Sequence, residues 1–227
     1  MGHKLSAIII TLNEERNIGR ALESLEGIAD EVIVVDSFST DKTPEIVKNS
    51  GAQLIQEEWM GYSATKNFAN ALATCDYILS IDADEALSPE LKNQILAQKQ
   101  KGFSGVYEMN RMTNYLGKWI RYSGWFPDWK VRIFPRDETK WTGEFVHEEL
   151  EFSSPQKTKR LNGILEHYSY YSYTDHRARA DKYSRLTAQK FHAAGKRVGI
   201  LKPYLSAIGR FVAMYFIKMG FLDGWKG

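Results

Sequence analysis

The amino-acid sequence predicts an α/β fold, a doubly wound and mostly parallel sheet with a helical extension at its carboxyl end. Three observations support this prediction. Short apolar runs alternate with amphipathic helical patterns through the first hundred residues. Polar or acidic residues follow directly after three of the predicted strands. The chain of 227 residues, 43% hydrophobic and 26% charged, has the composition of a globular protein with an adequate core.

Periodicity indicates the individual elements of the first half. Short runs rich in β-branched and other apolar residues predict four strands, at residues 5–12, 31–35, 53–56 and 77–81. Between them, helices are expected to open at Asn13-Glu14-Glu15, at Thr43-Pro44-Glu45 and near Tyr62. This alternation is typical of a parallel sheet, in which ligands bind beyond the carboxyl ends of the strands.

The fourth predicted strand runs directly into three carboxylates, Asp82, Asp84 and Glu85. Ionised carboxylates are seldom buried unless they are paired or bind a metal. Two aspartates separated by one small residue suit a divalent cation such as Mg²⁺ or Mn²⁺, which also bridges to substrate phosphates. The alternative is a solvated acidic turn before a helix that is capped by Ser88 and begins at Pro89.

The convergence of three polar segments favours a ligand site over an isolated turn. Asn13-Glu14, Asp36 and Asp82-Ala83-Asp84 all fall where a predicted strand ends, so a parallel sheet would bring them to one edge. The first strand is not followed by Gly-X-Gly-X-X-Gly, and the chain has no Walker-type loop. These absences argue against dinucleotide-dependent oxidoreductases and P-loop NTPases.

The order and spacing of these motifs resemble family 2 glycosyltransferases of the nucleotide-diphospho-sugar transferase (GT-A) fold. The resemblance covers about residues 4–150 and is closest to the lipopolysaccharide core glucosyltransferases, an inverting group that uses sugar nucleotides. One loop departs from the family pattern, because Ser37-Phe38 stands where a glycine is commoner. The matching segments are Thr11-Leu12-Asn13-Glu14-Glu15, Val35 to Asp41, Lys66-Asn67, Asp82-Ala83-Asp84-Glu85, Trp141 to Glu149 and Gly220 to Gly224.

The resemblance implies a binding site for a UDP-sugar donor. Asp36 would accept a hydrogen bond from the uracil ring, and Asp82 would meet the ribose or a metal-bound water. Asp84 would hold the divalent metal that bridges the two phosphates. Lys66 would neutralise the diphosphate, although a solvated helix lysine is the alternative. The implied donor site consists of Thr11, Leu12, Asn13, Glu14, Asp36, Lys66, Asp82, Ala83 and Asp84.

The segment after Gly102 changes character and is rich in aromatic residues. A mixed loop of Trp, Tyr, Arg and Asp suits a carbohydrate acceptor, because aromatic faces stack on sugar rings. Trp125 and Asp128 are therefore expected to contact the acceptor, although core packing is the alternative for the tryptophans. Arg132 lies in a predicted strand at residues 130–134, as an acceptor or phosphate contact or as a structural ion pair.

Phe145-Val146-His147-Glu148-Glu149 is the second predicted centre of chemistry. Inverting sugar transfer needs a general base that takes the proton from the acceptor hydroxyl. Glu148 is the first candidate for this base and Glu149 the second. His147 is a candidate metal ligand, because neutral imidazole binds Mn²⁺. A histidine beside acidic residues can equally be structural.

The net charge of +2 conceals an asymmetry along the chain. Residues 1–150 carry 16 Lys+Arg and 23 Asp+Glu, whereas residues 151–227 carry 14 and 5. A basic helix at 175–192 and an apolar one at 202–222, interrupted by Arg210 and Lys218, suggest attachment to an anionic membrane surface. Docking on the catalytic domain, or a homodimer, is the alternative. The single Cys75 fits a reducing compartment.

Together these patterns predict a GT-A catalytic domain at residues 4–152 and a helical extension at 153–227. The catalytic domain would have a donor half at 4–102 and an acceptor half at 103–152. The expected function is inverting, metal-dependent transfer of a hexose, glucose in the first place, from a UDP-sugar to a glycolipid or lipopolysaccharide core acceptor. It would act at the inner face of the cytoplasmic membrane, without a nucleic-acid partner. The alternatives are a nucleotidyltransferase, a nucleic-acid-binding module and a non-catalytic, membrane-attached sugar-nucleotide binder.

Overall fold

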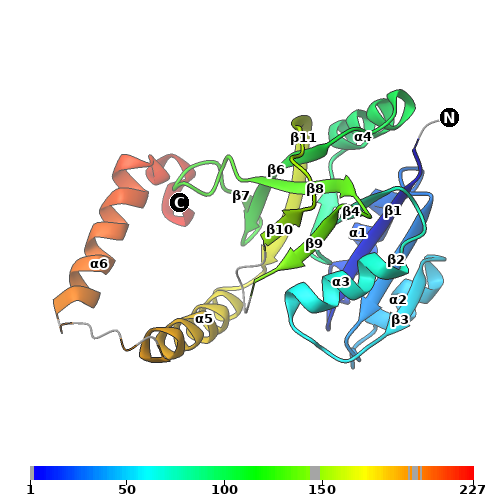
Figure 1. Ribbon diagram of the computed structural model, residues 1–227. Coiled ribbons are helices and arrows are strands. Elements are labelled where there is room, and N and C mark those ends of the chain that lie inside the picture. The colour runs from blue at the N-terminus through cyan, green and yellow to red at the C-terminus, as the bar shows by residue number, and fades with distance from the viewer. Residues whose placement is uncertain (1–2, 144–148, 194, 196–198, 200) are drawn as a thin grey trace. The chain divides into compact units, whose positions relative to one another are not determined.

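The computed structural model describes residues 3–143, 149–193, 195, 199 and 201–227 (Figure 1). Strands and helices alternate along the first hundred residues, as the sequence predicts. The first elements are β1 (Leu5–Thr11), α1 (Ile18–Leu25), β2 (Glu31–Asp36), α2 (Thr43–Asn49), β3 (Gln53–Gln56), α3 (Tyr62–Leu72), β4 (Tyr77–Ser80), β5 (Glu85–Leu87) and α4 (Pro89–Lys101). They are followed by β6 (Val106–Tyr115), β7 (Lys118–Trp119), β8 (Trp129–Pro135), β9 (Thr139–Thr142), β10 (Glu149–Phe152) and β11 (Thr158–Tyr170).

A nine-stranded sheet forms the framework of the described residues, in the order β3-β2-β1-β4-β8-β6-β11-β5, with β7 paired to β6. The strands β3, β2, β1 and β4 are parallel to one another, which confirms the α/β prediction for the first half. β8 then pairs antiparallel with both β4 and β6, and β5 pairs antiparallel with β11. These pairings in the second half of the sheet are therefore antiparallel, and the expectation of a mostly parallel sheet holds only for the first half.

Both faces of the sheet are covered, as expected for parallel strands between helices. Successive residues of β1 alternate between two apolar clusters, because side chains on a strand point to opposite faces. Leu5 and Ile9 pack in one cluster with residues of α1, α2 and α4. Ile8 packs in the other with Ala69 of α3 and with Phe134. Leu5, Ile8 and Ile9 are all essentially inaccessible to solvent.

The boundaries of the helices show where local sequence signals were sufficient. Ser88 caps α4 as predicted, since its hydroxyl accepts a hydrogen bond from Leu91 N at 3.3 Å and Pro89 is the first helical residue. The expected start of the first helix at Asn13 is wrong. Residues 13–17 form a loop and α1 begins at Ile18. The cause is a set of contacts to a second loop, described below.

The chain divides into two compact units. The first unit contains Met1–Arg111 and Trp129–His167, and the second contains Met112–Asp128 and Tyr168–Gly227. The segment 112–128, which includes the end of β6 and all of β7, thus groups with the carboxyl-terminal residues and not with β8, which follows it. The domain division expected from sequence, with a boundary at residues 152–153, stays a prediction.

Helices make up most of the second unit. α5 (Tyr173–Ala193), α6 (Leu201–Phe211), η1 (Val212–Ile217) and η2 (Gly220–Lys226) follow one another. The predicted basic helix corresponds to α5, and α6 buries none of its residues. Among the described residues, no single helix is long and apolar enough to cross a membrane. The pair Leu201–Ile217 and Gly220–Lys226, bent by 112°, passes such a test by length and composition alone.

Candidate functional site

The predicted donor residues meet at one edge of the parallel strands. Thr11 ends β1 and pairs with Asp36, the last residue of β2. β4 lies on the other side of β1 and ends just before Asp82. The carboxyl ends of these three strands therefore lie side by side, where parallel sheets bind ligands. Two hydroxyls at this edge, Thr11 Oγ1 and Ser37 Oγ, are buried without a hydrogen-bond partner among the described residues.

The loops that follow β1 and β2 are hydrogen-bonded to each other. Asn13 has a left-handed backbone (φ 56°), and its side-chain oxygen accepts a hydrogen bond from Thr40 N at 2.8 Å. Asn13 N donates to Ser39 Oγ at 2.7 Å, and Glu14 N donates to Thr43 Oγ1 at 2.8 Å. The backbone amides of the predicted helix start thus donate hydrogen bonds to the loop that follows β2 and to the start of α2. Leu12, beside them, is 49% exposed.

Asp36 lies at the predicted position but is fully buried. Its carboxylate accepts hydrogen bonds from Ser39 N at 3.0 Å, from the Ser39 hydroxyl and from Gln56 Nε2 at 3.2 Å. Phe38 adopts a positive φ of 60° and exposes half of its ring. Phe38 therefore adopts the left-handed backbone that a glycine would take in this turn, with about 1 kcal/mol of backbone strain. The role of Asp36 towards uracil stays a prediction.

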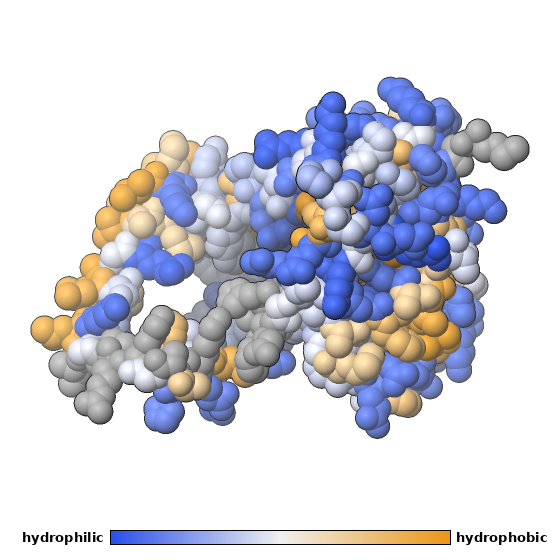
Figure 2. All heavy atoms as spheres, viewed as in Figure 1, coloured by the Kyte–Doolittle hydropathy of each residue, from blue (hydrophilic) through white to orange (hydrophobic). Residues whose placement is uncertain are grey.

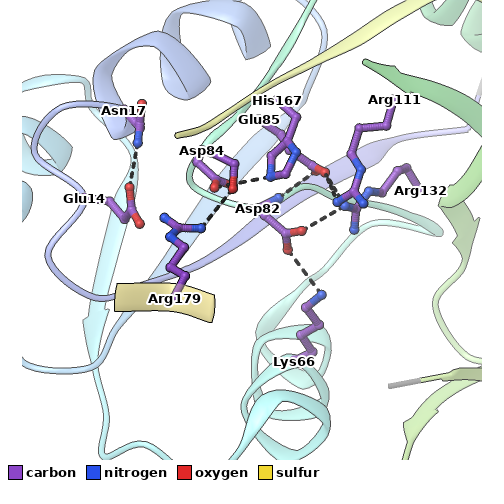
Figure 3. Close-up of polar contacts among 11 residues, drawn as sticks. Glu14, Asn17, Lys66, Asp82, Asp84, Glu85, Arg111, Arg132, His167 and Arg179 are labelled. Carbon is purple, nitrogen blue, oxygen red and sulfur yellow. Dashed lines mark hydrogen bonds and ion pairs between the residues drawn. The ribbon is translucent and has the colours of Figure 1, made fainter. Parts of the chain in front are cut away.

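Asp82 is paired with two cations (Figure 3). Lys66 Nζ lies 3.2 Å from its Oδ1 and Arg132 Nη2 lies 2.8 Å from its Oδ2. Burial alone would raise the pKa of Asp82, but the charges of Arg132 and Lys66 outweigh burial and hold that pKa well below its usual value. One third of the Asp82 side chain remains exposed, so its carboxylate can meet a ligand.

Lys66 is 3% exposed, and its Nζ also lies 4.5 Å from the centre of the Trp141 ring. This burial excludes the alternative of a solvated helix lysine. Arg132 is 4% exposed, and its guanidinium is shared between Asp82 and Glu85. Burial would lower the pKa of Arg132, and the two carboxylates raise it above its usual value. The charge of the buried Arg132 is thus offset by two carboxylates, and Lys66 pairs with one of them.

Glu85 organises the turn between β4 and β5. It is 1% exposed, accepts from Arg132 Nη2 at 2.5 Å and pairs with Arg111 Nη1 at 3.4 Å. Its second oxygen accepts the backbone N–H of Asp82 at 3.1 Å. Glu85 thereby fixes the backbone at the start of the Asp82-Ala83-Asp84 turn. Sequence reasoning identified Glu85 as an acid of this segment but gave no role to Arg111.

Asp84 lies against His167, with 3.3 Å between its Oδ2 and the histidine Nε2 (Figure 3). The two side chains are 13% and 14% exposed. His167 comes from β11 and pairs with Glu85 of β5 in the sheet. Sequence reasoning missed this histidine, because only the antiparallel pairing of two strands eighty residues apart brings it to the site.

The acidic turn fits a divalent metal that substrate helps to hold. Among the described residues, no group of three His, Cys, Asp or Glu side chains converges closely enough to bind a metal. Mg²⁺ in enzymes is commonly held by one or two carboxylates together with substrate phosphates and water. Asp84, with the imidazole of His167 beside it, provides such a partial donor set, in which the imidazole suits Mn²⁺ better than Mg²⁺.

The remaining predicted site residues are distributed over the molecule. His147 and Glu148 lie outside the described residues. Glu149 is exposed at the start of β10, opposite Thr142 of β9. Trp125 and Asp128 belong to the second unit, whereas Arg132 belongs to the first. Roles of these residues in catalysis or acceptor binding stay predictions.

The aromatic residues of the second unit pack against one another. The Trp125 ring lies 5.8 Å from Tyr115 and 6.0 Å from Tyr170. The hydroxyl of Tyr115 is 2.7 Å from His176 Nδ1, and burial raises the pKa of this tyrosine. Trp125 keeps part of its surface accessible, so it combines a packing role with an open face.

Comparison with known proteins places the chain in a family. The model of glycosyl transferase family 2 matches residues 6–156. An uncharacterized glycosyltransferase of Rickettsia prowazekii is 34% identical, over 99% of this chain and 80% of the relative. The lipopolysaccharide core biosynthesis glycosyltransferase LpsC of Rhizobium meliloti is 28% identical, over 98% of this chain and 83% of that protein.

A solved structure, residues 1–349 of TarS from S. aureus, shares the fold. It matches with a TM-score of 0.51 at 19% identity, and the match covers 73% of this chain and 60% of that one. The likeness to TarS concerns the fold alone. The chain belongs to glycosyl transferase family 2, and it has the GT-A fold of these enzymes.

Proposed function

We propose that the protein transfers a hexose, glucose in the first place, from a UDP-sugar to a glycolipid acceptor of the lipopolysaccharide core type, with inversion at the anomeric carbon. The observation that carries this proposal is the pairing of buried Lys66 and Arg132 with Asp82 at the carboxyl edge of the strands. A diphosphate needs cations that are already desolvated and held in place. The name of the Rhizobium relative supports an acceptor of the lipopolysaccharide core.

The nucleoside would bind where β1 and β2 end. The unsatisfied hydroxyls of Thr11 and Ser37 support this assignment, because buried polar groups normally have partners. Leu12, Asn13 and Glu14 would line the base and ribose pocket. Asp36 already accepts hydrogen bonds from Ser39 and Gln56, but a carboxylate has about four acceptor positions. It can therefore also accept the ring N–H of uracil.

Asp84 and Asp82 would hold the divalent ion, with His167 beside Asp84 and His147 as a further candidate. When bound, such an ion offsets the negative charge that develops on the departing diphosphate. Lys66 contributes a fixed positive charge to the same group, because its Nζ is held between Asp82 and the face of Trp141. Glu85 holds the turn in shape through Arg132 and the Asp82 amide.

Glu148 is the proposed general base and Glu149 the second candidate. The base takes the proton from the acceptor hydroxyl while the hydroxyl oxygen attacks the anomeric carbon. UDP leaves from the opposite face of the sugar. Trp125, Asp128 and Arg132 are the proposed acceptor contacts. The acceptor would be met at the cytoplasmic face of an anionic membrane, to which the carboxyl-terminal helices attach peripherally.

Calorimetric titration of UDP and UDP-glucose, with Mn²⁺ and again with EDTA, tests the donor and the metal. Asp84→Asn should weaken metal-dependent UDP binding by at least about tenfold. Asp137→Asn is the matched control, since Asp137 belongs to the same unit and its side chain is 82% exposed. Equal UDP affinity of the two variants would remove Asp84 from the metal site. No uridine nucleotide binding in any condition would contradict the proposed donor.

Glu148→Gln tests the base separately. If Glu148 acts only on the acceptor proton, UDP binding should be unchanged, while turnover should fall by roughly 10²–10⁴-fold. Glu149→Gln in parallel decides between the two candidates. Wild-type turnover in both variants would place the base elsewhere, and full UDP binding without any transfer by the wild-type protein would favour the non-catalytic binder.

A further inference from the structure

The helix α6 has an apolar stripe that nothing in the described part of the chain covers. The stripe consists of Leu201, Tyr204, Leu205, Ile208 and Phe211, and it continues through Val212, Phe216 and Ile217 of η1. Its members on α6 follow at intervals of three or four residues, so they lie on one side of the helix. Each is between 57% and 69% exposed. Figure 2 shows these hydrophobic atoms gathered over α6.

Exposed apolar side chains are concentrated in the last 27 residues. Of the 20 large hydrophobic residues that are exposed in the described part of the chain, 12 lie from Leu201 onward. Three of them, Phe221, Leu222 and Trp225, belong to η2, and Trp225 is 79% exposed. Contiguous apolar surface of this kind marks an interaction site, and exposed tryptophan is typical of the membrane–water interface.

The charge of the surrounding segment decides between a second copy and a lipid surface. Residues 173–227 contain 11 Lys+Arg but only three acidic residues. One of these acids, Asp223, is 4% exposed and accepts hydrogen bonds from two backbone amides. A second copy would bring two strongly basic segments together, whereas anionic lipid headgroups attract them. The charge therefore favours a bilayer.

We propose that α6, η1 and η2 form a surface that binds an anionic lipid bilayer. The apolar stripe enters the boundary between headgroups and acyl chains, and Lys202 and Arg210 on the other side of α6 stay at headgroup level. A spanning arrangement is disfavoured because Arg210 and Lys218 interrupt the apolar sequence. This inference rests on the proposed function only in placing a lipid-linked acceptor on the same surface.

The end of the membrane-binding segment, at residues 218–226, is hydrogen-bonded to the loop at residues 116–123 that precedes Trp125. Asp223 Oδ2 accepts hydrogen bonds from Arg121 N at 2.9 Å and Tyr122 N at 2.8 Å. Gly220 packs so closely here that a Cβ would meet Ser123 Oγ at 2.3 Å. Further links run from Lys118 Nζ to Asp223 O, from Lys226 Nζ to Leu116 O and from Ser123 N to Lys218 O. Within the second unit, hydrogen bonds therefore link the end of the proposed bilayer surface to the proposed acceptor loop.

Flotation of the full chain with vesicles tests the proposal. The wild-type protein should bind vesicles of equal parts phosphatidylcholine and phosphatidylglycerol at least about tenfold more tightly than phosphatidylcholine alone, and added salt should weaken the difference. Ile208→Asp and Ser206→Asp form a matched pair, since both add one negative charge to α6. Only Ile208 belongs to the stripe, so Ile208→Asp should bind at least about tenfold more weakly than Ser206→Asp. Circular dichroism checks that both variants keep their helices.

Equal binding of the two variants, or no wild-type binding to anionic vesicles, would overturn the proposal. A dimer in light scattering that Ile208→Asp dissociates, without vesicle binding, would assign the stripe to a second copy. Calorimetric UDP binding, measured on the same samples, should be the same for the wild-type protein and both variants. Vesicle binding without UDP binding would leave this inference standing while the proposed donor fails.

Hydrogen exchange tests the hydrogen bonds between Asp223 and the loop at Arg121 and Tyr122. Asp223→Ala should deprotect the amides of Arg121 and Tyr122 while the protein still binds anionic vesicles, because the apolar stripe is unchanged. Unaltered protection of both amides would show that Asp223 does not hold this loop to the membrane-binding segment.

Discussion

The two units differ in which side chains they bury: the first buries charged groups, whereas the second exposes large apolar ones. In the first unit Lys66, Glu85 and Arg132 are each 4% exposed or less. In the second unit Ile208 is 62% exposed and Trp225 is 79% exposed. The first unit can bury charges because cation and carboxylate neutralise each other there. The comparison shows that the chemical type of a residue does not decide its burial; the available partners do, and on our proposal the missing partner of the second unit is lipid.

The largest effect should come from breaking the buried charge network of the first unit. Glu85→Ala removes the carboxylate between Arg132 and Arg111 and should lower the free energy of unfolding by about 3–5 kcal/mol. Glu108→Ala is the control, because Glu108 pairs with Arg160, whose side chain is 62% exposed, and should cost about 0–1 kcal/mol. Urea denaturation measures both. Equal losses would mean that the network adds no more than a surface pair.

A pair of isoleucines tests the comparison for apolar groups. Ile33 of β2 is fully buried, so Ile33→Ala should cost about 2–5 kcal/mol of unfolding free energy. Ile208→Ala should change it by less than about 0.5 kcal/mol in the absence of lipid, since no cavity forms. A large loss at Ile208 would indicate that α6 is packed in solution, and the contrast between the units would then be wrong.

A smaller effect is expected when Lys66, the buried cation proposed to contact the diphosphate, is replaced. Lys66→Met should weaken UDP binding by about 10–100-fold, because a charge-assisted contact is lost, and leave uridine binding almost unchanged. Lys182→Met changes an exposed lysine of α5 and should alter neither ligand. Calorimetry with UDP and uridine measures the difference. If the variant lost affinity for both ligands equally, Lys66 would support the pocket rather than contact phosphate.

The smallest effect concerns pH. The pKa of Asp82 is held below its usual value, so its ion pairs stabilise the folded state fully above the unfolded pKa of about 4. That stabilisation is lost as the pH falls below this value towards the folded pKa. As the pH falls below about 5, the free energy of unfolding of Asp82→Asn should therefore decrease less steeply than that of the wild-type protein. Asp137→Asn should follow the wild-type curve, and an identical curve for Asp82→Asn would show that these pairs do not stabilise the fold.

Local patterns predicted much of the first half of the fold. The four parallel strands and the start of α4 follow from apolar runs and from the cap at Ser88-Pro89, which act over a few residues. The start of α1 could not be predicted in this way. Asn13 and Glu14 carry good helix-start chemistry, but their amides bond to Ser39 and Thr43, twenty-six or more residues away. The long-range hydrogen bonds between the two loops thus outweigh the local preference for a helix start at Asn13.

The candidate site shows the same division. Asp82 and Asp84 were predicted because they directly follow a buried strand. Arg111 and His167 were not, since each reaches the acidic turn from a distant strand. His167 faces Glu85 only because β11 pairs antiparallel with β5. Nothing in the spacing of these residues along the chain indicates that register.

The sequence by itself determined the family (through the resemblance of its motifs), the parallel half of the sheet and the position of the proposed donor residues at strand ends. The strands depend on apolar periodicity, and the strand-end positions depend on residues adjacent in the chain. Only the tertiary structure decided that Lys66 is buried, that Glu85 is an internal counter-ion and that the tail at Asp223 holds the loop at Arg121 and Tyr122. The physical reason is that burial and ion pairing depend on contacts between distant segments, which the folded chain alone brings together.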